Sequence, residues 1–145
     1  MEISRRTDYA VRVIFDLASL PQNGRASTQE IADRQNIPSP FLAKIISQLS
    51  LSGLVTTYRG AGGGVRLAQP PEEISLLRVI EALEGPIRLN RCAIQPSLCP
   101  REGFCPIHDT WAKAQADLTS LLEATTFDDL ATLAQQKRQQ AKDTT

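Results

Sequence analysis

Residues 27–68 of the 145-residue chain read STQEIADRQNIPSPFLAKIISQLSLSGLVTTYRGAGGGVRLA. The opening residues Ser27–Glu30 form a capping box, which predicts a helix that ends near Asn36. Ser39 and Pro40 then predict the N-cap and the first position of another helix. Two short helices joined by a tight turn are the outline of a helix-turn-helix.

The rest of this stretch predicts a β-hairpin. The second helix is expected over residues 41–51, with Gly53 suited to its C-cap. Residues 54–58 and 65–68 both have the composition of strands, and the glycine-rich residues 59–64 lie between them. A helix-turn-helix followed by such a hairpin is a winged helix. We therefore expect a mainly α fold with a two-stranded wing.

The remaining elements are expected to be helices. Apolar spacing and capping residues predict them over residues 5–19, from Ser75 to Gly85, from Pro106 onward and from Thr126 onward. The expected parts of the chain are a winged helix-turn-helix domain at residues 1–85, a cysteine-rich loop at 86–106, a dimerisation helix with a short final helix at 107–134, and a frayed polar tail at 135–145.

The long helix has one apolar seam, formed by Trp111, Ala114, Leu118, Leu121 and Leu122. Little of the chain follows this helix that could cover the seam. Packing against the chain's own domain is one solution, and pairing with a second copy of the same helix is the more economical one. Helix-turn-helix proteins commonly bind DNA as dimers on two half-sites. We therefore expect a homodimer joined through this long C-terminal helix.

The composition is that of one globular domain. Apolar residues make up 41% of the chain, charged residues make up 22%, and the formal net charge is zero. Residues 1–68 carry 8 Lys and Arg against 5 Asp and Glu, a basic bias that is compatible with nucleic acid. No apolar run reaches the ~20 residues of a membrane span, so we expect a cytoplasmic protein with no membrane partner. A single histidine and the lack of a nucleophile–base pattern argue against an enzyme.

Double-stranded DNA, as an operator, is the expected partner of the winged helix. The helix over residues 41–51 would enter the major groove, and the glycine-rich wing would approach the minor groove or the phosphates. For each candidate taken alone, a plain surface residue is the alternative. The residues expected to contact DNA are Arg5, Thr28, Gln29, Ser39, Pro40, Ala43, Lys44, Ser47, Arg59, Gly60, Gly62 and Gly63.

The most specific local pattern is Cys92-x6-Cys99-x5-Cys105-x2-His108. Three thiolates and an imidazole so close together are typical ligands of iron–sulfur clusters or of zinc. His108 and Asp8 compete as the fourth ligand, with a surface histidine and a salt-bridged aspartate as their alternatives. Three inert thiols, or a regulatory disulfide between two of them, are the alternatives to a metal site.

Short motifs spread along the chain match those of a known family. They are Met1–Ser4, Asp8–Arg12, Ile31-Ala32, Pro40–Leu42, Leu49 with Leu54-Val55, Arg59–Gly64, Ile74–Leu76 and Ile80–Pro86. Together with the three cysteines they resemble the IscR/NsrR superfamily of winged-helix transcription regulators. The resemblance covers roughly residues 1–134.

This resemblance implies a homodimer crossed through the long helix, with Cys92, Cys99 and Cys105 as cluster ligands in a loop beside it. In IscR-like members the fourth ligand is a histidine placed like His108, and the cluster is 2Fe–2S. In NsrR-like members it is an aspartate placed like Asp8, from the other subunit, and the cluster is 4Fe–4S. The chain has both residues, and we favour 2Fe–2S. The first cysteine gap is six residues where five are usual.

The expected function is that of a homodimeric DNA-binding transcription regulator. It would sense iron–sulfur status, redox state or nitric oxide through a cysteine-ligated iron–sulfur cluster. The alternatives are a zinc-stabilised DNA-binding protein without sensing and a regulator switched by thiol–disulfide exchange.

Overall fold

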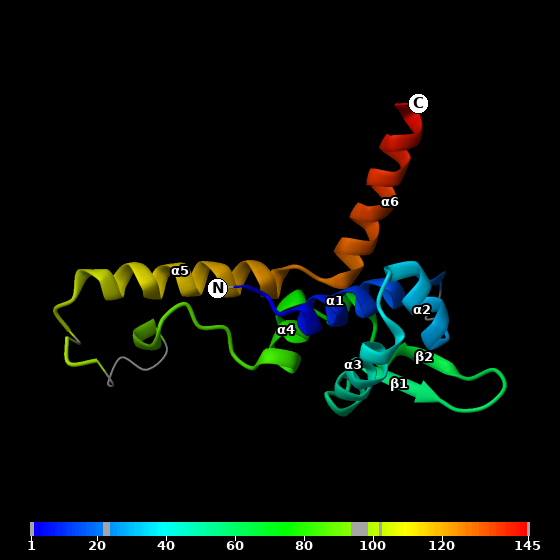
Figure 1. The fold of residues 1–145 in the computed structure, drawn as a ribbon. Coiled ribbons are helices and arrows are strands. Elements are labelled where there is room, and N and C mark those ends of the chain that lie inside the picture. Colours follow the sequence, from blue (N-terminus) through cyan, green and yellow to red (C-terminus); the bar gives the residue numbers. More distant parts are fainter. Residues whose placement is uncertain (1, 22–23, 94–98, 102, 145) are drawn as a thin grey trace.

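Helices dominate the part of the chain that the computed structural model describes, which is residues 2–21, 24–93, 99–101 and 103–144. The elements are α1 (Arg5–Ala18), α2 (Thr28–Gln35), α3 (Ser39–Leu51), β1 (Val55–Tyr58), β2 (Gly64–Leu67), a 3-10 turn (Pro71–Glu73), α4 (Leu76–Glu84), a second 3-10 turn (Arg91–Ala93), α5 (Pro106–Ala124) and α6 (Phe127–Asp143) (Figure 1). The predicted mainly α winged helix is confirmed.

Helix α1 lies at the centre of the core. Val13, Ile14 and Leu17 are fully or almost fully buried, and α1 packs against α2, α3, α4 and α6. The Ser4 hydroxyl caps this helix by accepting a hydrogen bond from the Thr7 N–H at 3.2 Å. The apolar spacing that predicts the helix is therefore also the pattern that builds the core.

The helix-turn-helix forms as its capping residues predict. Ser27 and Glu30 make both bonds of the capping box of α2. The Ser27 N–H is the main cause of the lowered pKa of the Glu30 carboxyl. Asn36 ends α2 in the left-handed conformation, with φ of 53°. One boundary is wrong: Pro38, not Ser39, is the N-cap of α3, and no side-chain bond caps this helix.

The wing is a two-stranded antiparallel sheet. Val55 pairs with Leu67 at its base, and Tyr58 pairs with Gly64 beside the turn. Ala26, just before α2, adds an isolated bridge to Val65 of β2. The wing is thus attached to the helix-turn-helix by backbone hydrogen bonds as well as by its own connection to α3.

Helix α6 corrects the expected polar tail. It continues to Asp143, so a frayed segment from Gln135 is wrong. Residues 134–142 contain no glycine or proline and consist of alanine, glutamine, lysine and arginine, which favour helix without needing an apolar face. The first turn anchors the helix in the core, because Phe127 is fully buried and its N–H donates to the Ile74 carbonyl at 3.0 Å.

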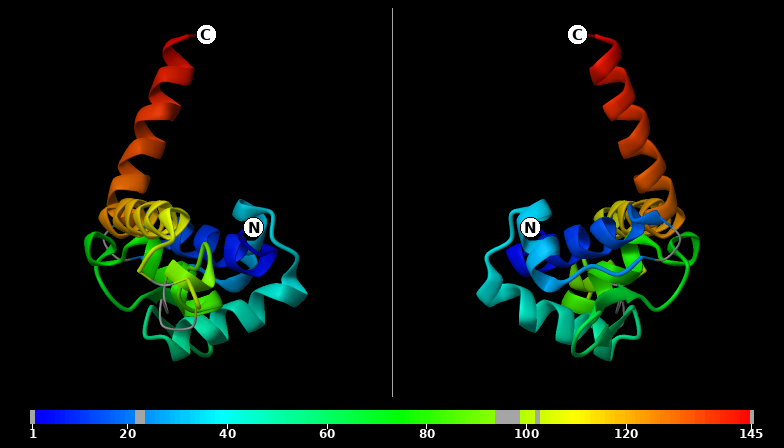
Figure 2. Two further views of the ribbon diagram at one scale, coloured as in Figure 1. Left: turned by 90° about the vertical axis from the view of Figure 1, so that its left-hand side faces the viewer. Right: turned by 90° about the vertical axis from the view of Figure 1, so that its right-hand side faces the viewer.

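Helices α5 and α6 both extend from the winged helix. Figure 1 shows α5 running outward above the cysteine-containing segment, and Figure 2 shows α6 rising on the side away from α3. No residue of α5 is buried. In the described part of the chain, no helix is both long and apolar enough to cross a membrane.

The buried carboxylate of Asp16 joins α1 to α2. It is 4% exposed and accepts bonds from Arg34 Nε at 3.0 Å, Arg34 Nη2 at 2.9 Å and Gln35 Nε2 at 3.0 Å. We expect Asp16→Ala to lower the free energy of unfolding by about 1–3 kcal/mol, because these donors lose their acceptor. Urea unfolding measures this. Asp33→Ala, which removes an exposed carboxylate of α2, should change stability by less than about 0.5 kcal/mol. Equal effects would contradict the assignment.

Candidate functional site

Helix α3 presents a polar face that could enter a DNA groove. Its apolar side is in the core, with Leu42, Ile45, Ile46 and Leu49 buried. The predicted DNA-contacting residues of this helix are exposed, and they are Ser39, Pro40, Ala43, Lys44 and Ser47. Lys44 is the one cation on this face. The charge that holds phosphates must therefore come mainly from other elements.

The N-terminal turn of α2 lies close to the wing. Thr28 and Gln29 are exposed there, as predicted. Gln29 already donates a hydrogen bond to Asp33 at 2.8 Å. A groove of about 470 Å³ runs between this turn and the wing, lined by residues that include Thr28, Tyr58 and Gly62. The predicted contacts of α2 and of the wing thus meet at one surface.

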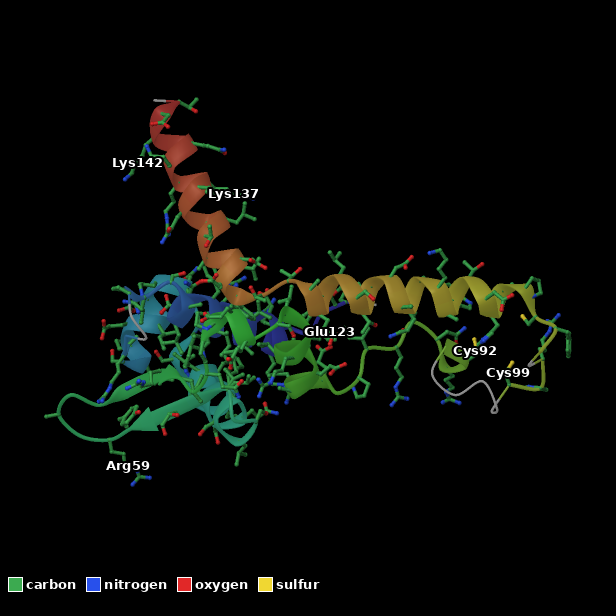
Figure 3. All side chains as sticks on the ribbon, turned by 180° about the vertical axis from the view of Figure 1, so that it is seen from behind. Arg59, Cys92, Cys99, Glu123, Lys137 and Lys142 are labelled. Carbon is green, nitrogen blue, oxygen red and sulfur yellow. The ribbon has the colours of Figure 1, made fainter. Side chains whose placement is uncertain are left out.

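The wing turn has the tight geometry that its glycines predict. The Gly63 N–H donates to the Gly60 carbonyl at 2.9 Å, and Gly60 and Gly62 have positive φ angles of 83° and 78°. A Cβ on Gly63 would lie 2.6 Å from the Tyr58 carbonyl oxygen, so only glycine fits there. Arg59 is exposed just after β1, and Figure 3 shows its side chain extending away from the protein.

Within the described ranges, two of the three arginines of α1 make bonds inside the protein, unlike Arg59 of the wing. Arg5 is exposed in the first turn. Arg6 donates to the Leu83 carbonyl at 2.9 Å, and Arg12 pairs with Asp8 at 2.8 Å. Helix α1 therefore offers Arg5 rather than all three cations to a DNA phosphate.

The cysteines and the histidine lie at one end of the molecule. Cys92 is in the 3-10 turn that packs against α5, Cys105 is the residue before α5, and His108 is in the first turn of α5. Cys99 lies near the same end of α5 (Figure 3). All four side chains are half-buried. Residues 94–98 and 102, which complete the predicted loop, lie outside the described residues.

A glutamine that the sequence analysis missed holds the start of this segment to α5. The Gln115 side chain donates to the Ile87 carbonyl at 2.6 Å and accepts from the Leu89 N–H at 2.8 Å. His108 lies seven residues before Gln115 and therefore on the same face of the helix. That face is the one that looks toward residues 87–93. A lone glutamine in a helix gives no sequence signal for a contact across 28 residues.

Asp8 lies apart from this group within one chain. It lines a groove of about 770 Å³ together with Leu118 and Leu122, near the other end of α5. Ten residues of helix separate His108 from Leu118, which is about 15 Å at 1.5 Å per residue. Among the residues described by the structure, no three His, Cys, Asp or Glu side chains stand together as a group that could hold a metal ion.

Glu84 forms another part of the wall of that groove. Hydrogen bonds from the Ser4 hydroxyl and the Ser4 N–H are the main causes of the lowered pKa of this carboxyl. The bond from the Ser4 N–H to Glu84 Oε1, at 2.8 Å, ties the N-terminal segment to the end of α4. The groove thus has a fixed acidic edge and an apolar floor.

Helix α5 leaves an apolar stripe uncovered. Ile107, Trp111 and Leu121 are 59%, 39% and 65% exposed. With Ala114 and Leu118 they recur at intervals of four, three, four and three residues. This is the a/d spacing of a coiled-coil seam. Leu122 of the predicted seam is instead half-buried and lines the groove beside Asp8. Among the described residues, Ile107, Trp111 and Leu121 of this stripe stay exposed, while Ala114 and Leu118 are half-buried.

Comparison with known proteins identifies the family. The family model Rrf2, described as iron-dependent transcriptional regulator, matches residues 3–133. An HTH-type transcriptional regulator of Synechocystis is 45% identical over 84 residues, a match that spans 58% of this chain and only 57% of that protein. Family members are transcription regulators and not enzymes, as the sequence analysis predicts.

Solved structures agree with this match. IscR of T. potens has a TM-score of 0.74 and 30% identity, over 92% of this chain and 88% of that chain. CymR of B. subtilis, the global cysteine regulator, has a TM-score of 0.73 and 28% identity, over 92% and 98%. The resemblance to the IscR/NsrR superfamily is confirmed. With its helix-turn-helix, its wing and this match over nearly the whole length, the chain belongs to the Rrf2 family of DNA-binding transcription regulators.

Proposed function

We propose that this regulator is a homodimer that acts on DNA in the cytoplasm and senses through an iron–sulfur cluster held by Cys92, Cys99, Cys105 and His108. The observation that carries the proposal is the common position of these four donors at the N-terminal end of α5. Similarity to T. potens IscR supports it.

The donor set suits such a cluster. Thiolates are the ligands that hold iron–sulfur clusters, and histidine replaces cysteine on iron in some of them. A cluster held by three thiolates carries net negative charge, and Arg91 and Arg101 lie in the same segment as the cysteines. Half-burial of the thiols also limits the access of water.

His108 is a better fourth ligand than Asp8 for a site within one chain. His108 is on the face of α5 that Gln115 ties to residues 87–89. Asp8 is engaged by Arg12 at 2.8 Å and lines the groove beside Leu118, which is about 15 Å along α5 from His108. Asp8 could therefore serve only a site on a second copy. For a site within one chain, this difference supports His108 and the 2Fe–2S form that we propose. Asp8 from the second chain of the proposed dimer is the alternative that the iron count tests.

The uncovered seam of α5 supports the homodimer. A stripe of Ile107, Trp111, Ala114, Leu118 and Leu121 buries its apolar surface when the same stripe of a second chain packs on it. Crossing through α5 would also hold two winged helices at a fixed separation, as binding to two half-sites requires.

The chain's own residues would connect the two functions. A bound cluster would supply a redox-active group that oxygen or nitric oxide can change. Gln115 joins the cysteine segment to α5, and α5 carries the dimer seam. A change at the cysteines would thus reach the element that sets the spacing of the wings. Such coupling is typically about 1–3 kcal/mol, a 5- to 150-fold change in affinity.

The test is anaerobic purification with iron, sulfide and zinc counts per chain and a visible spectrum. We expect roughly two iron and two sulfide atoms per chain, as a cluster of the 2Fe–2S type requires. Four of each would overturn His108 in favour of Asp8. Zinc without visible colour would instead indicate a DNA-binding dimer that zinc stabilises and that does not sense. Thiols that bind no metal but pair on oxidation would indicate a disulfide switch.

A further inference from the structure

We propose that Arg25 is a positioning residue for DNA binding, which holds the glycine-rich turn of the wing in the shape that meets DNA. The inference rests on the wing's contact with DNA, and it is independent of the cluster. Arg25 lies in the segment before α2, outside the helix-turn-helix and outside the wing itself.

One side chain joins Arg25 to two parts of the wing. Its Nη1 donates to the Gly62 carbonyl at 3.0 Å. Its guanidinium carbon lies 4.0 Å from the centroid of the Tyr58 ring, a cation–π contact. Arg25 therefore links the last residue of β1 with the turn that follows it.

The backbone next to Arg25 is held in place by hydrogen bonds to β2. The Ala26 N–H donates to the Val65 carbonyl at 3.0 Å, and the Val65 N–H donates to the Ala26 carbonyl at 2.8 Å. A Cβ on Gly64 would lie 2.6 Å from the Ala26 carbonyl oxygen, so the two backbones approach closely. The backbone next to Arg25 is therefore bonded to β2, a strand of the same sheet whose turn the Arg25 side chain contacts.

The wing turn needs such support. A two-stranded hairpin alone is marginally stable in water. Glycine loses more conformational freedom on ordering than any other residue, and four of the five residues 60–64 are glycine. A turn that is already ordered in the free protein loses less entropy on binding. The bond to Gly62 and the contact with Tyr58 supply that order.

Arg59 is the natural comparison, because it lies in the wing that Arg25 contacts and, like Arg25, is an exposed arginine. In the described part of the chain, Arg59 makes no hydrogen bond or ion pair, and its side chain extends away from the protein (Figure 3). The two arginines therefore have different roles. Arg59 offers its charge to a phosphate or to the minor groove, and Arg25 uses its guanidinium within the protein.

Salt dependence of DNA binding separates the two roles. The probe is a duplex selected by the wild-type protein from a random-sequence pool, and affinity is measured by fluorescence anisotropy over a range of salt. A residue that contacts one phosphate adds about 0.9 to the slope of log K against log salt. We expect Arg59→Ala to lower this slope by about that amount and Arg25→Ala to leave it unchanged.

The affinity itself should still fall in Arg25→Ala, by about five- to thirty-fold, from the loss of one charged hydrogen bond and one cation–π contact. Tyr58→Leu should have a similar effect, and the double variant should be no weaker than the worse single one. Arg25→Lys, which keeps a cation and a donor, should recover part of the affinity.

Amide hydrogen exchange gives a readout that does not depend on DNA. Arg25→Ala should speed exchange of the Gly63 N–H in the turn, while the Val65 N–H, bonded to Ala26, keeps its protection. A slope lowered by about 0.9 in Arg25→Ala would show a phosphate contact and overturn the positioning role. Unchanged affinity in Arg25→Ala would also overturn it. A normal iron count in each variant would show that cluster sensing is not what failed.

Discussion

Leu121→Glu is expected to dissociate the proposed dimer into monomers and to lower operator affinity by about 10²- to 10⁴-fold. Leu121 is 65% exposed in the single chain and lies in the seam with Ile107, Trp111 and Leu118. In a paired seam the new carboxylate would be buried without a partner, which is strongly unfavourable. A dimer that contacts two half-sites binds DNA more tightly than a monomer on one half-site by about this factor. The monomer therefore loses that gain in affinity. Light scattering and fluorescence anisotropy measure the two effects.

Ala116→Glu is the matched control for this variant. It adds the same charge to the same helix, and Ala116 is exposed on the side opposite Leu121 and Ala114. We expect it to remain dimeric and to bind the operator as the wild type does. If Leu121→Glu is dimeric with unchanged affinity, the seam is not the interface.

Local signals explain why the winged helix could be predicted. The capping box at Ser27 and Glu30 and the cap at Thr126 are short motifs whose partners lie three residues away. The wing follows from strand residues on both sides of a glycine turn. Each of these elements is specified by neighbours in sequence, and the structure confirms all of them.

Features without a local pattern were missed. The second half of α6 has no apolar face, so periodicity gave no reason to extend it beyond Leu133. The predicted N-cap Ser39 is instead the first residue of α3, because Pro38 acts as the N-cap without a side-chain bond. Helix propensity over residues 134–142 favours the longer helix, but the polar composition of these residues also fits a frayed tail.

In the candidate sites too, features set by neighbours in sequence are predicted, and contacts between distant residues are not. Exposure of Lys44 and Arg59 follows from helix periodicity and turn position, and the structure agrees. The pair of Arg12 with Asp8 is one helical turn apart and follows from the sequence. The bonds from Arg6 to the Leu83 carbonyl and from Arg12 to the Gln35 carbonyl do not follow, because these carbonyls are distant in sequence. The spacing of the cysteines identifies donors of the right chemistry. It does not say which fourth ligand the fold brings near them.

Cys99→Ala is expected to remove the visible colour of the anaerobic protein entirely and to abolish the cluster-dependent part of DNA binding, a 5- to 150-fold effect. A three-thiolate site that loses one ligand no longer completes the coordination of the cluster. Fold and dimer should persist, because Cys99 is half-buried outside the core and away from the seam of α5. Iron and sulfide analysis, circular dichroism and light scattering check each part.

The fourth ligand is decided by a matched pair of variants. We expect His108→Ala to lower iron retention and to shift the visible spectrum, because an imidazole is lost from the iron. Asp8→Ala should keep both, since Asp8 lies near Leu118 and pairs with Arg12. The reverse result would assign the fourth ligand to Asp8 and require that it come from the second chain. A full cluster in Cys99→Ala would refute the cysteine ligands themselves.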